Sequence, residues 1–478
     1  MGSYNLDGII TNFKGTRSTY GWTLGQAVEG LQIFGGIGSG KTSGSGRTVA
    51  IEYLHCRFGG LVLTVKTDER KLWEQYCKET NRLNDLIIVS PDSNHRFNFI
   101  NYEMNRKGRG KGLTDNVVHV LQTVINVDKQ NEDSSGNNDA FWQNALSMLM
   151  YAVIDLCQLA YGKVTLDAII EIAQTIPQNI ETLKKPSLYQ TAFGRAILAI
   201  RQKRDEGNLS EKEFRLYKNT ENYIVNNYIG LAERTRSTID QYFIGTLSRL
   251  HRDPVYSLFC SDDNDTFSPE DSLDGKIILL DIPVKEFDKV GRNVQVLFKY
   301  IWQRSMERRK KDGLFRPVFL WADEAQNFIH EHDITYQATA RSQRICTVYL
   351  TQNLPNYYNQ IGGKHSENLI ASFLGTMGTK IFHANVDKKT NDYAADLIGK
   401  DFRSLKQGGH SSDGTGMTVN QNESKQLHHI VPPERFAFLR TGGEINDYTI
   451  DAIIHCQDPP WAIENISYHI TSFTQKII

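Results

Sequence analysis

Residues 35–43 have the types and the spacing that bind the phosphates of a nucleotide. The pattern G-x-x-x-x-G-K-T, followed by serine, is made by Gly35, Gly36, Ile37, Gly38, Ser39, Gly40, Lys41, Thr42 and Ser43. In such a loop backbone amides surround the β- and γ-phosphates, the lysine binds them, and the threonine hydroxyl is left for Mg²⁺. A glycine-rich turn before a helix is the alternative, but the apolar residues 31–34 are typical of the buried strand that precedes a phosphate loop. The sequence therefore predicts a site for ATP and Mg²⁺.

A pair of adjacent acids ends a second apolar run. Asp323 and Glu324 follow the apolar residues 318–322. Hydrolysis needs a carboxylate that holds Mg²⁺ and a group that orients or deprotonates water, and a strand neighbouring the phosphate loop is expected to carry both. We predict that Asp323 holds Mg²⁺ together with Thr42 and that Glu324 polarises the attacking water. A strand end followed by a helix cap is the alternative, and Asp281 is a rival that lacks a paired glutamate.

Two further side chains are candidates for the same reaction. Gln352 follows the apolar residues 346–351, and we predict that it senses the γ-phosphate or holds the water; a plain strand-end amide is the alternative. Arg341 is the first candidate, and Arg344 the second, for a guanidinium that acts across an interface if subunits form a ring. A solvated helix face is the alternative for both arginines.

The elements that must position these residues follow from the hydrophobic pattern. Short apolar runs separated by helix-length segments predict an α/β fold, with a mostly parallel sheet covered by helices on both faces. The runs are residues 31–34, 61–65, 86–89, 277–281, 318–322, 346–351 and 379–384, with a helix over 47–53. Near the end of the chain, residues 436–440 and 448–454 are predicted to form antiparallel strands. The polar residues 404–423 are predicted to form a mobile loop, because they have hardly an apolar side chain to bury.

The strand pattern stops between residues 103 and 250. Apolar side chains there recur at helical spacing, which predicts an inserted all-α domain. The expected organisation is a first part of the nucleotide-binding domain over 1–102, the insertion over 103–250, and the second part over 251–478. A single core-facing helix of the α/β domain is the alternative explanation for the apolar stripe around residues 141–159.

Net charge, cysteine content and hydrophobic runs limit the classes of protein to which this chain can belong. The 478 residues carry a formal net charge of −1, so a nucleic-acid contact has to be local rather than a property of the whole surface. Six scattered cysteines suit reduced thiols in a cytoplasmic protein. We find no secretory signal and no run of about 18 uninterrupted apolar residues that would span a membrane.

These motifs together resemble the type IV coupling proteins, the TraG/TraD-type ATPases of conjugative DNA transfer. The resemblance covers most of the chain in the same order. It is carried by the phosphate loop, by Trp321-Ala322-Asp323-Glu324-Ala325-Gln326, by Arg341-Ser342, by Leu350-Thr351-Gln352-Asn353, by Phe141-Trp142-Gln143-Asn144-Ala145, by Thr379-Lys380-Ile381-Phe382-His383-Ala384-Asn385 with Thr390-Asn391-Asp392-Tyr393-Ala394-Ala395, and by Val431-Pro432-Pro433-Glu434 with Thr441-Gly442-Gly443.

The resemblance implies a RecA-like P-loop NTPase core interrupted by an all-α domain. It also implies a hexameric ring with ATP between subunits, DNA at the central channel, and a helical domain that faces the relaxase and its relaxosome. Members of that family commonly begin with transmembrane helices, which the residues before the phosphate loop do not form. We therefore expect a cytoplasmic protein that a separate membrane or secretion-channel protein recruits to the inner face of the cell membrane.

Two other functions stay open at this point. One is a soluble translocase of the wider HerA/FtsK-like group that acts in chromosome handling or phage defence. The other is a scaffold that assembles on ATP and hardly hydrolyses it, against which the intact pair of acids argues. Two basic clusters are candidates for the DNA backbone, with solvated faces as the alternative. They are Arg106, Lys107, Arg109 and Lys111, and Arg308, Arg309, Lys310 and Lys311.

Overall fold

A large, mostly parallel sheet forms the body of the protein. The computed structural model describes residues 4–13, 21–129, 138–262, 265–311, 314–413, 416–457 and 467–476. Within this part of the chain, nine strands form one sheet in the order β13-β12-β9-β3-β8-β7-β4-β6-β5. Their bounds in that order are Tyr468–Thr474, Thr449–Cys456, Thr379–Phe382, Leu31–Phe34, Ile345–Thr351, Val318–Ala322, Gly59–Leu63, Ile277–Leu280 and Leu86–Val89. The strands from β9 through β5 run parallel, and β12 pairs antiparallel with β9 and β13.

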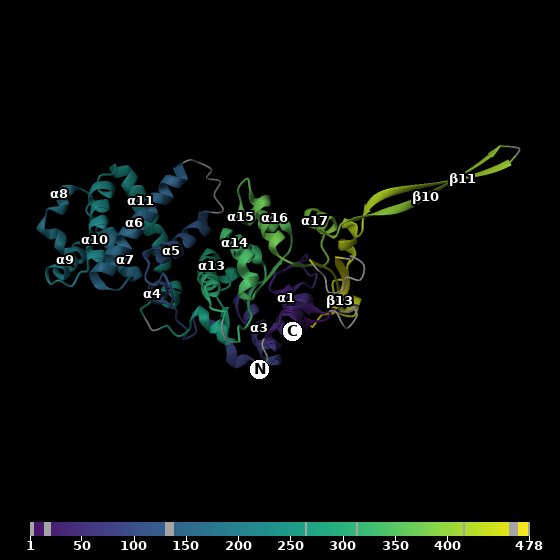
Figure 1. The fold of residues 1–478 in the computed structure, drawn as a ribbon, viewed down its shortest axis with the longest axis horizontal. Helices are drawn as coiled ribbons and strands as arrows, with labels where there is room; N and C mark the ends of the chain where they lie inside the picture. Colours follow the sequence, from purple (N-terminus) through teal and green to yellow (C-terminus); the bar gives the residue numbers. More distant parts are fainter. Residues whose placement is uncertain are drawn as a thin grey trace.

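Helices cover the sheet and also form a separate lobe (Figure 1). Those next to the sheet are α1 (Leu24–Ala27), α2 (Arg47–His55), α3 (Glu69–Glu79), α13 (Val284–Arg308), α14 (Glu331–Ala340), α15 (Leu354–Ile361), α16 (Ser366–Thr376) and α17 (Lys388–Ile398). Between β5 and β6 come α4 (Phe99–Asn105), α5 (Thr114–Lys129), α6 (Asn138–Tyr161), α7 (Leu166–Gln174), α8 (Ile180–Leu183), α9 (Ala192–Asp205), α10 (Glu211–Asn222), α11 (Glu233–Leu250) and α12 (Val255–Phe259). A short ribbon, β1 (Ile9–Thr11) with β2 (Trp22–Thr23), completes the amino-terminal part.

The strands are apolar throughout because both faces of the sheet are buried. Successive side chains of a strand point to opposite faces, so Leu61 and Leu63 of β4 enter one core and Val62 enters the other. The first core is shared with α13, α14, α15 and α16, and the second with α2 and α3. The predicted α/β class with helices on both faces is therefore confirmed, and each predicted strand from 31–34 to 379–384 is present within one or two residues at its ends.

One detail of the strand order differs from the expectation. The strand that ends in the two acids, β7, is not the immediate neighbour of the phosphate-loop strand, because β8 pairs with both β3 and β7. The three loops that follow these strands still open at the same edge, since parallel strands end together.

The helical lobe lies at one end of the molecule (Figure 1). Its longest helix contains the one segment of the described residues, Phe141–Tyr161, that by length and hydropathy could cross a membrane, and 61% of that window is buried inside the protein. Burial of this kind is what a core helix of a bundle shows, and Leu149, Val153 and Leu156 are in contact with the common core. The domain boundaries at 102/103 and 250/251 stay a prediction.

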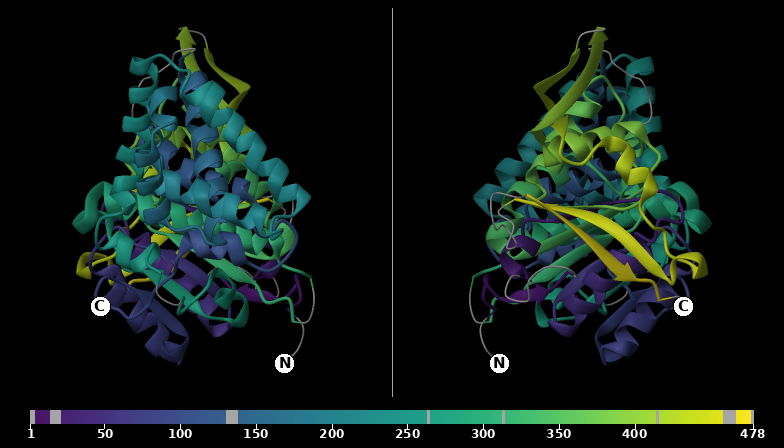
Figure 2. Two further views of the ribbon diagram at one scale, coloured as in Figure 1. Left: turned by 90° about the vertical axis from the view of Figure 1, so that its left-hand side faces the viewer. Right: turned by 90° about the vertical axis from the view of Figure 1, so that its right-hand side faces the viewer.

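The predicted strand over 436–440 is wrong. This stretch forms a 3₁₀ helix, Pro433–Phe438. Pro432 comes just before the helix and Pro433 is its first residue. The ring of Phe436 packs on that of Phe382, with centroids 5.8 Å apart. Just after this stretch, Thr441 makes an isolated bridge to Ile450 of β12, and the carbonyl of Arg440 accepts the backbone amide of Asp451 at 3.0 Å. The prolines at 432 and 433 favour the turn of the 3₁₀ helix over a strand. Strand β12 pairs instead with β9 over residues 453–456 and with β13 over residues 449–455, and β12 and β13 are the yellow strands in the right-hand view of Figure 2.

The predicted loop over 404–423 is also wrong. The chain forms a long antiparallel hairpin, β10 (Lys400–Asp413) with β11 (Gly416–His429), which projects from the body on the side away from the helical lobe (Figure 1). The register runs from Lys400 opposite His429 to Asp413 opposite Gly416. Backbone hydrogen bonds between two strands need no apolar side chains, although a two-stranded ribbon by itself is only marginally stable.

The start of β4 offers a test of the close packing below the sheet. A Cβ atom added to Gly59 would lie 1.9 Å from the carbonyl oxygen of Ser272. We expect Gly59→Ala to lower the free energy of unfolding by about 1–3 kcal/mol, because the backbone of either segment has to move. The measurement is denaturant-induced unfolding followed by circular dichroism.

Gly245 in α11 supplies the matched control. A Cβ atom there meets nothing within 4 Å. Gly245→Ala should raise the free energy of unfolding by about 0.5–1 kcal/mol, because alanine has less backbone freedom to lose in a helix. Equal effects of the two substitutions would contradict the close approach at Gly59.

Candidate functional site

Most of the predicted site residues lie at the carboxyl edge of the parallel strands, and Arg341 is the exception. A cavity of about 450 Å³ opens at the carboxyl edge. Its walls come from loops that follow four different strands, from helix α3, and from Gln475 near the end of the chain. The lining residues are Gly36, Ile37, Gly38, Ser39, Gly40, Lys41, Thr42, Ser43, Lys66, Leu72, Tyr76, Glu324, Gln352 and Gln475.

The phosphate loop has the backbone that its glycines permit. Gly38 and Gly40 have φ angles of 71° and 82°, in the left-handed region that other residues rarely adopt. The chain then makes a π-helical turn, Thr42–Gly46, before α2 begins. A Cβ atom on Gly46 would lie 2.8 Å from the Lys41 carbonyl oxygen. Gly46 thus allows the tight turn that brings the loop onto the sheet.

Thr42 and Asp323, the two predicted ligands of Mg²⁺, are in direct contact. The Thr42 hydroxyl donates to Asp323 Oδ2 at 2.7 Å, and the other oxygen of Asp323 accepts the backbone amide of Glu324 at 2.9 Å. A hydroxyl and a carboxylate are the oxygen donors that Mg²⁺ prefers. The donor set therefore fits Mg²⁺.

Glu324 lies at the centre of the polar groups in the cavity. Lys41 Nζ is 3.3 Å from Glu324 Oε1, and the side-chain amides of Gln352 and Gln326 donate to the same carboxylate at 3.3 and 2.8 Å. Burial by itself raises the pKa of Glu324, but Lys41, the two amides and Lys66 lower it below its ordinary value. Its φ of 50° is left-handed, a strained state for a non-glycine residue that functional sites often hold.

Lys66 is a site residue that the sequence reasoning missed. Its ammonium lies 3.7 Å from Asp323 Oδ2 and 4.0 Å from Glu324 Oε1. Burial lowers the pKa of Lys66, but the carboxylates of Asp323, Glu69 and Glu324 raise it above its ordinary value. It comes shortly after β4, so a search for polar residues just past each parallel strand would have found it.

A second missed group supports the phosphate loop from below. His383, which follows β9, is fully buried; its Nε2 lies 2.7 Å from the Ser45 hydroxyl and its Nδ1 lies 3.1 Å from the carbonyl oxygen of Asp451. Burial, helped by the charge of Lys41, lowers the pKa of His383 to about 4. The neutral ring therefore links the π-helical turn to strand β12.

The two arginine candidates lie away from the cavity. Arg341 precedes β8, so it is at the amino edge of the sheet, where it is exposed and lies 3.0 Å from Glu29 Oε1. Arg344 is bound within its own subunit, because its guanidinium stacks on the ring of Phe315 at 4.9 Å and donates to the Phe315 carbonyl at 3.1 Å. Neither arginine reaches the phosphate loop of its own chain.

The remaining candidates are placed as follows. Asp281, the rival for Asp323, accepts from Arg70 at 3.1 Å and does not line the cavity. The two basic clusters lie side by side, because Glu103 is 2.7 Å from Arg106 and 3.7 Å from Arg308. Those two arginines are therefore paired with Glu103, and the exposed charged residues of the clusters are Lys107, Arg109, Lys111, Lys310 and Lys311.

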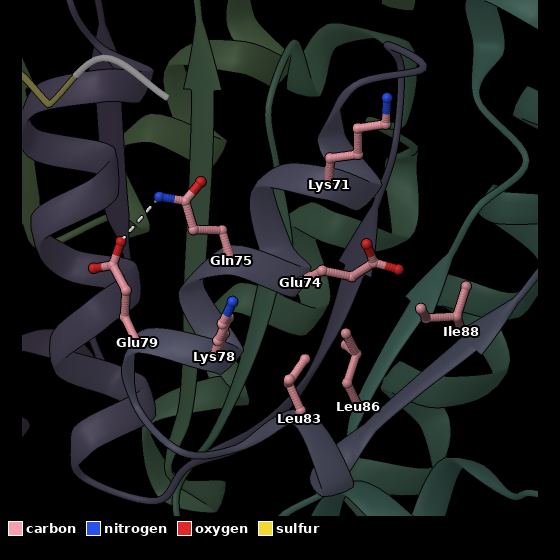
Figure 3. A pocket seen from close by; sticks show the side chains of 8 residues that line it. All are labelled: Lys71, Glu74, Gln75, Lys78, Glu79, Leu83, Leu86 and Ile88. Carbon is pink, nitrogen blue, oxygen red and sulfur yellow. Dashed lines mark hydrogen bonds between the residues drawn. The ribbon is translucent and has the colours of Figure 1, made fainter.

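A larger hollow of about 850 Å³ lies between helix α3 and the edge strand β5 (Figure 3). It is lined by Lys71, Glu74, Gln75, Lys78, Glu79, Leu83, Leu86 and Ile88. Within the described chain none of the predicted site residues lines it. Size alone therefore does not identify the site, and the smaller cavity has the phosphate-binding groups.

The buried His383 predicts a dependence of stability on pH. In the unfolded chain His383 takes up a proton near the ordinary histidine pKa, whereas in the folded protein its pKa is about 4. Between these two pH values the unfolded state binds the proton and the folded state does not. The free energy of unfolding therefore falls as the pH falls through this range. The loss is at most about 1.4 kcal/mol per pH unit for this group. Thermal melting near neutral pH and at about pH 5 should show that His383→Gln loses less stability on acidification than the wild type does.

His365, an exposed histidine, is the control for this measurement. His365→Gln should keep the wild-type loss of stability on acidification. If His383→Gln kept it as well, the buried neutral histidine would not be the cause.

Comparison with known proteins agrees with this geometry. A family model described as type IV secretory system, conjugative DNA transfer, matches residues 7–473. The chain is also similar to solved structures of the plasmid coupling protein TrwB. For TrwB in complex with ADP and Mg²⁺ the TM-score is 0.61 at 12% identity, covering 96% of this chain and 87% of that one.

Two further TrwB structures give similar values. The complex with a non-hydrolysable GTP analogue has a TM-score of 0.60 at 12% identity, covering 99% of this chain and 90% of that one. An unbound form has a TM-score of 0.58 at 12% identity, covering 95% and 86%. The comparison with curated proteins found no match. Identity this low shows a shared fold, whereas the family match extends over nearly the whole sequence. The chain therefore belongs to the type IV secretory system family of conjugative DNA transfer proteins.

Proposed function

We propose that this chain is an ATP-hydrolysing motor that couples or pumps DNA, alone or bound to a relaxase, in conjugative transfer. The observation that carries the proposal is the convergence on Glu324 of Lys41 and Gln352, beside the bond from Thr42 to Asp323. A protein that only bound a nucleotide would need the loop but not this second set of groups.

Each residue of the cavity has a distinct part in the proposed reaction. Lys41 binds the β- and γ-phosphates, and Glu324, ionised at neutral pH, orients and polarises the attacking water. Gln352 holds the same carboxylate and is placed to contact the water or the γ-phosphate. Thr42 and Asp323 hold Mg²⁺, which when bound neutralises charge on the transferring phosphate.

Two observations support ATP and Mg²⁺ as the ligands. The hydroxyl of Ser39, inside the phosphate loop, is buried and has no hydrogen-bond partner in the described chain. A buried hydroxyl without a partner is costly, and a phosphate oxygen would satisfy it. In addition, structures of TrwB hold ADP with Mg²⁺ in one case and a non-hydrolysable ATP analogue in another.

In this proposal the two basic clusters, which lie side by side, bind the DNA. Their exposed lysines and Arg109 lie on loops where the helical lobe meets the sheet body, and the net charge of the whole chain is only −1. Lysine and arginine on such loops bind phosphates without reading sequence, and the affinity falls with added salt. These exposed basic side chains are thus expected to bind the DNA backbone directly, as a local surface.

A hexameric ring completes the proposed assembly. Arg341 cannot reach the phosphates of its own subunit from the amino edge of the sheet, so a catalytic part for it requires a neighbouring subunit. The relaxase–DNA complex and a separate membrane or secretion-channel protein are the further partners, and the latter would recruit the ring from the cytoplasm to the inner face of the membrane.

Hydrolysis tests the proposal directly. Lys41→Ala and Glu324→Gln should each lower ATP turnover by about 10²-fold or more, since each removes a group that acts on the transferring phosphate or the water. Turnover should be measured with and without single- and double-stranded DNA, together with the mass of the oligomer. If the wild type hydrolysed ATP no faster than Glu324→Gln under ring-forming conditions, the proposed motor function would be wrong. Turnover that ignores DNA would instead favour a protein substrate.

Subunit mixing tests Arg341. Arg341→Ala alone should lose most turnover, by up to about 10³- to 10⁵-fold where such arginines act on phosphate. Mixing Arg341→Ala with Lys41→Ala subunits should restore part of it, because some interfaces then combine an intact loop with an intact arginine. Arg344→Ala is the control. Mixing Arg344→Ala subunits with Lys41→Ala subunits should not raise ATP turnover above that of the Arg344→Ala subunits alone. Linear loss without recovery would exclude action across the interface.

A further inference from the structure

A second lysine faces the nucleotide cavity from the end of a different strand. Lys66 follows β4 and lines the cavity that the phosphate loop opens into. Its ammonium and that of Lys41 both approach Glu324 Oε1, at 4.0 and 3.3 Å. Two cations thus flank one carboxylate oxygen in the cavity to which the proposed function assigns ATP.

The backbone of Lys66 is held by a network of buried groups. The carboxylate of Glu69, which is 6% exposed, accepts the backbone amides of Val65 at 2.6 Å and Lys66 at 3.3 Å. One residue earlier, the fully buried amide of Gln295 accepts the backbone N–H of Thr64 at 2.7 Å and donates to its carbonyl at 2.9 Å. Both hydrogen-bonding groups of the Thr64 backbone are therefore satisfied from inside the core.

This support fixes where the Lys66 side chain begins but leaves its end free to move. The side chain is 43% exposed, whereas that of Lys41 is 8% exposed. A long, half-exposed lysine that starts from a rigid loop can exchange one anion for another at small cost. Asp323 and Glu324 are its present partners, and a phosphate in the cavity would be a stronger one, since it carries more charge.

We propose that Lys66 binds the γ-phosphate of ATP, so that this chain distinguishes the triphosphate from the diphosphate. The inference rests on the proposed function, because it assigns one more residue to the same cavity. Lys41 contacts phosphates that ATP and ADP share in part, whereas Lys66 approaches the cavity from the side of the two acids. Its contribution is therefore expected for ATP and not for ADP.

A purely structural role makes a different prediction. If Lys66 only offset the charges of Asp323, Glu324 and Glu69, its removal would change the affinity for ATP and ADP alike. It would also strengthen Mg²⁺ binding, because a cation that competes for Asp323 would be gone. The ratio of the two nucleotide affinities therefore separates the two roles.

The experiment compares equilibrium binding of a non-hydrolysable ATP analogue and of ADP, each with Mg²⁺, to the full chain. Lys66→Ala should weaken binding of the analogue about tenfold or more, as loss of a charge-assisted hydrogen bond does, and ADP binding by less than about twofold. Lys66→Arg should keep most of the preference, because it retains the charge. Thermal melting of each variant shows whether it is folded.

Lys71 is the matched control, since it is an exposed lysine on the following helix α3 and lines the other hollow (Figure 3). Lys71→Ala should bind both nucleotides as the wild type does. An equal loss of ATP and ADP affinity in folded Lys66→Ala, or no loss, would overturn the inference while leaving the motor intact. A wild type that binds neither nucleotide would overturn the proposed function itself.

Discussion

The ion pair between Lys41 and Glu324 joins the two halves of the site, and most other features depend on it. The lysine belongs to the loop after β3 and the glutamate follows β7, with β8 between the two strands. Gln352 donates to the same carboxylate from the end of β8. Because parallel strands end at one edge, these three loops open together, and the residues meet only if the pairing register of all three strands is kept.

The body of the protein is built to hold that register. Its strands are buried on both faces, so a slip by one residue would move every side chain into the opposite core. Buried polar groups add local precision near the cavity. Gln295 satisfies the backbone of Thr64 at the end of β4, and His383 links Ser45 to strand β12. The strained backbone of Glu324 persists because its side chain has several partners at once.

The errors of sequence reasoning have physical causes that particular residues show. Residues 404–423 have few apolar side chains, which argued for a loop, yet two strands paired through their backbones satisfy each other. Residues 436–440 have a strand-like pattern, but the prolines at 432 and 433 begin a 3₁₀ helix, and β12 pairs with β9 and β13. Arg106 and Arg308 belong to basic runs, yet both pair with the buried Glu103. Pairing partners and buried counter-charges come from distant segments, so a local pattern does not reveal them.

The amino-acid sequence by itself determined the α/β class, the positions of the parallel strands, the phosphate loop and the acid pair that follows β7. These follow from glycine spacing and from apolar runs, which are local properties of the chain. Only the tertiary structure decided that Lys66 lines the cavity, that Gln326 binds Glu324, that His383 supports the loop, and that Arg341 lies at the far edge of the sheet. The reason is that these placements depend on which strands are neighbours and which edge a loop leaves from, and long-range pairing fixes both.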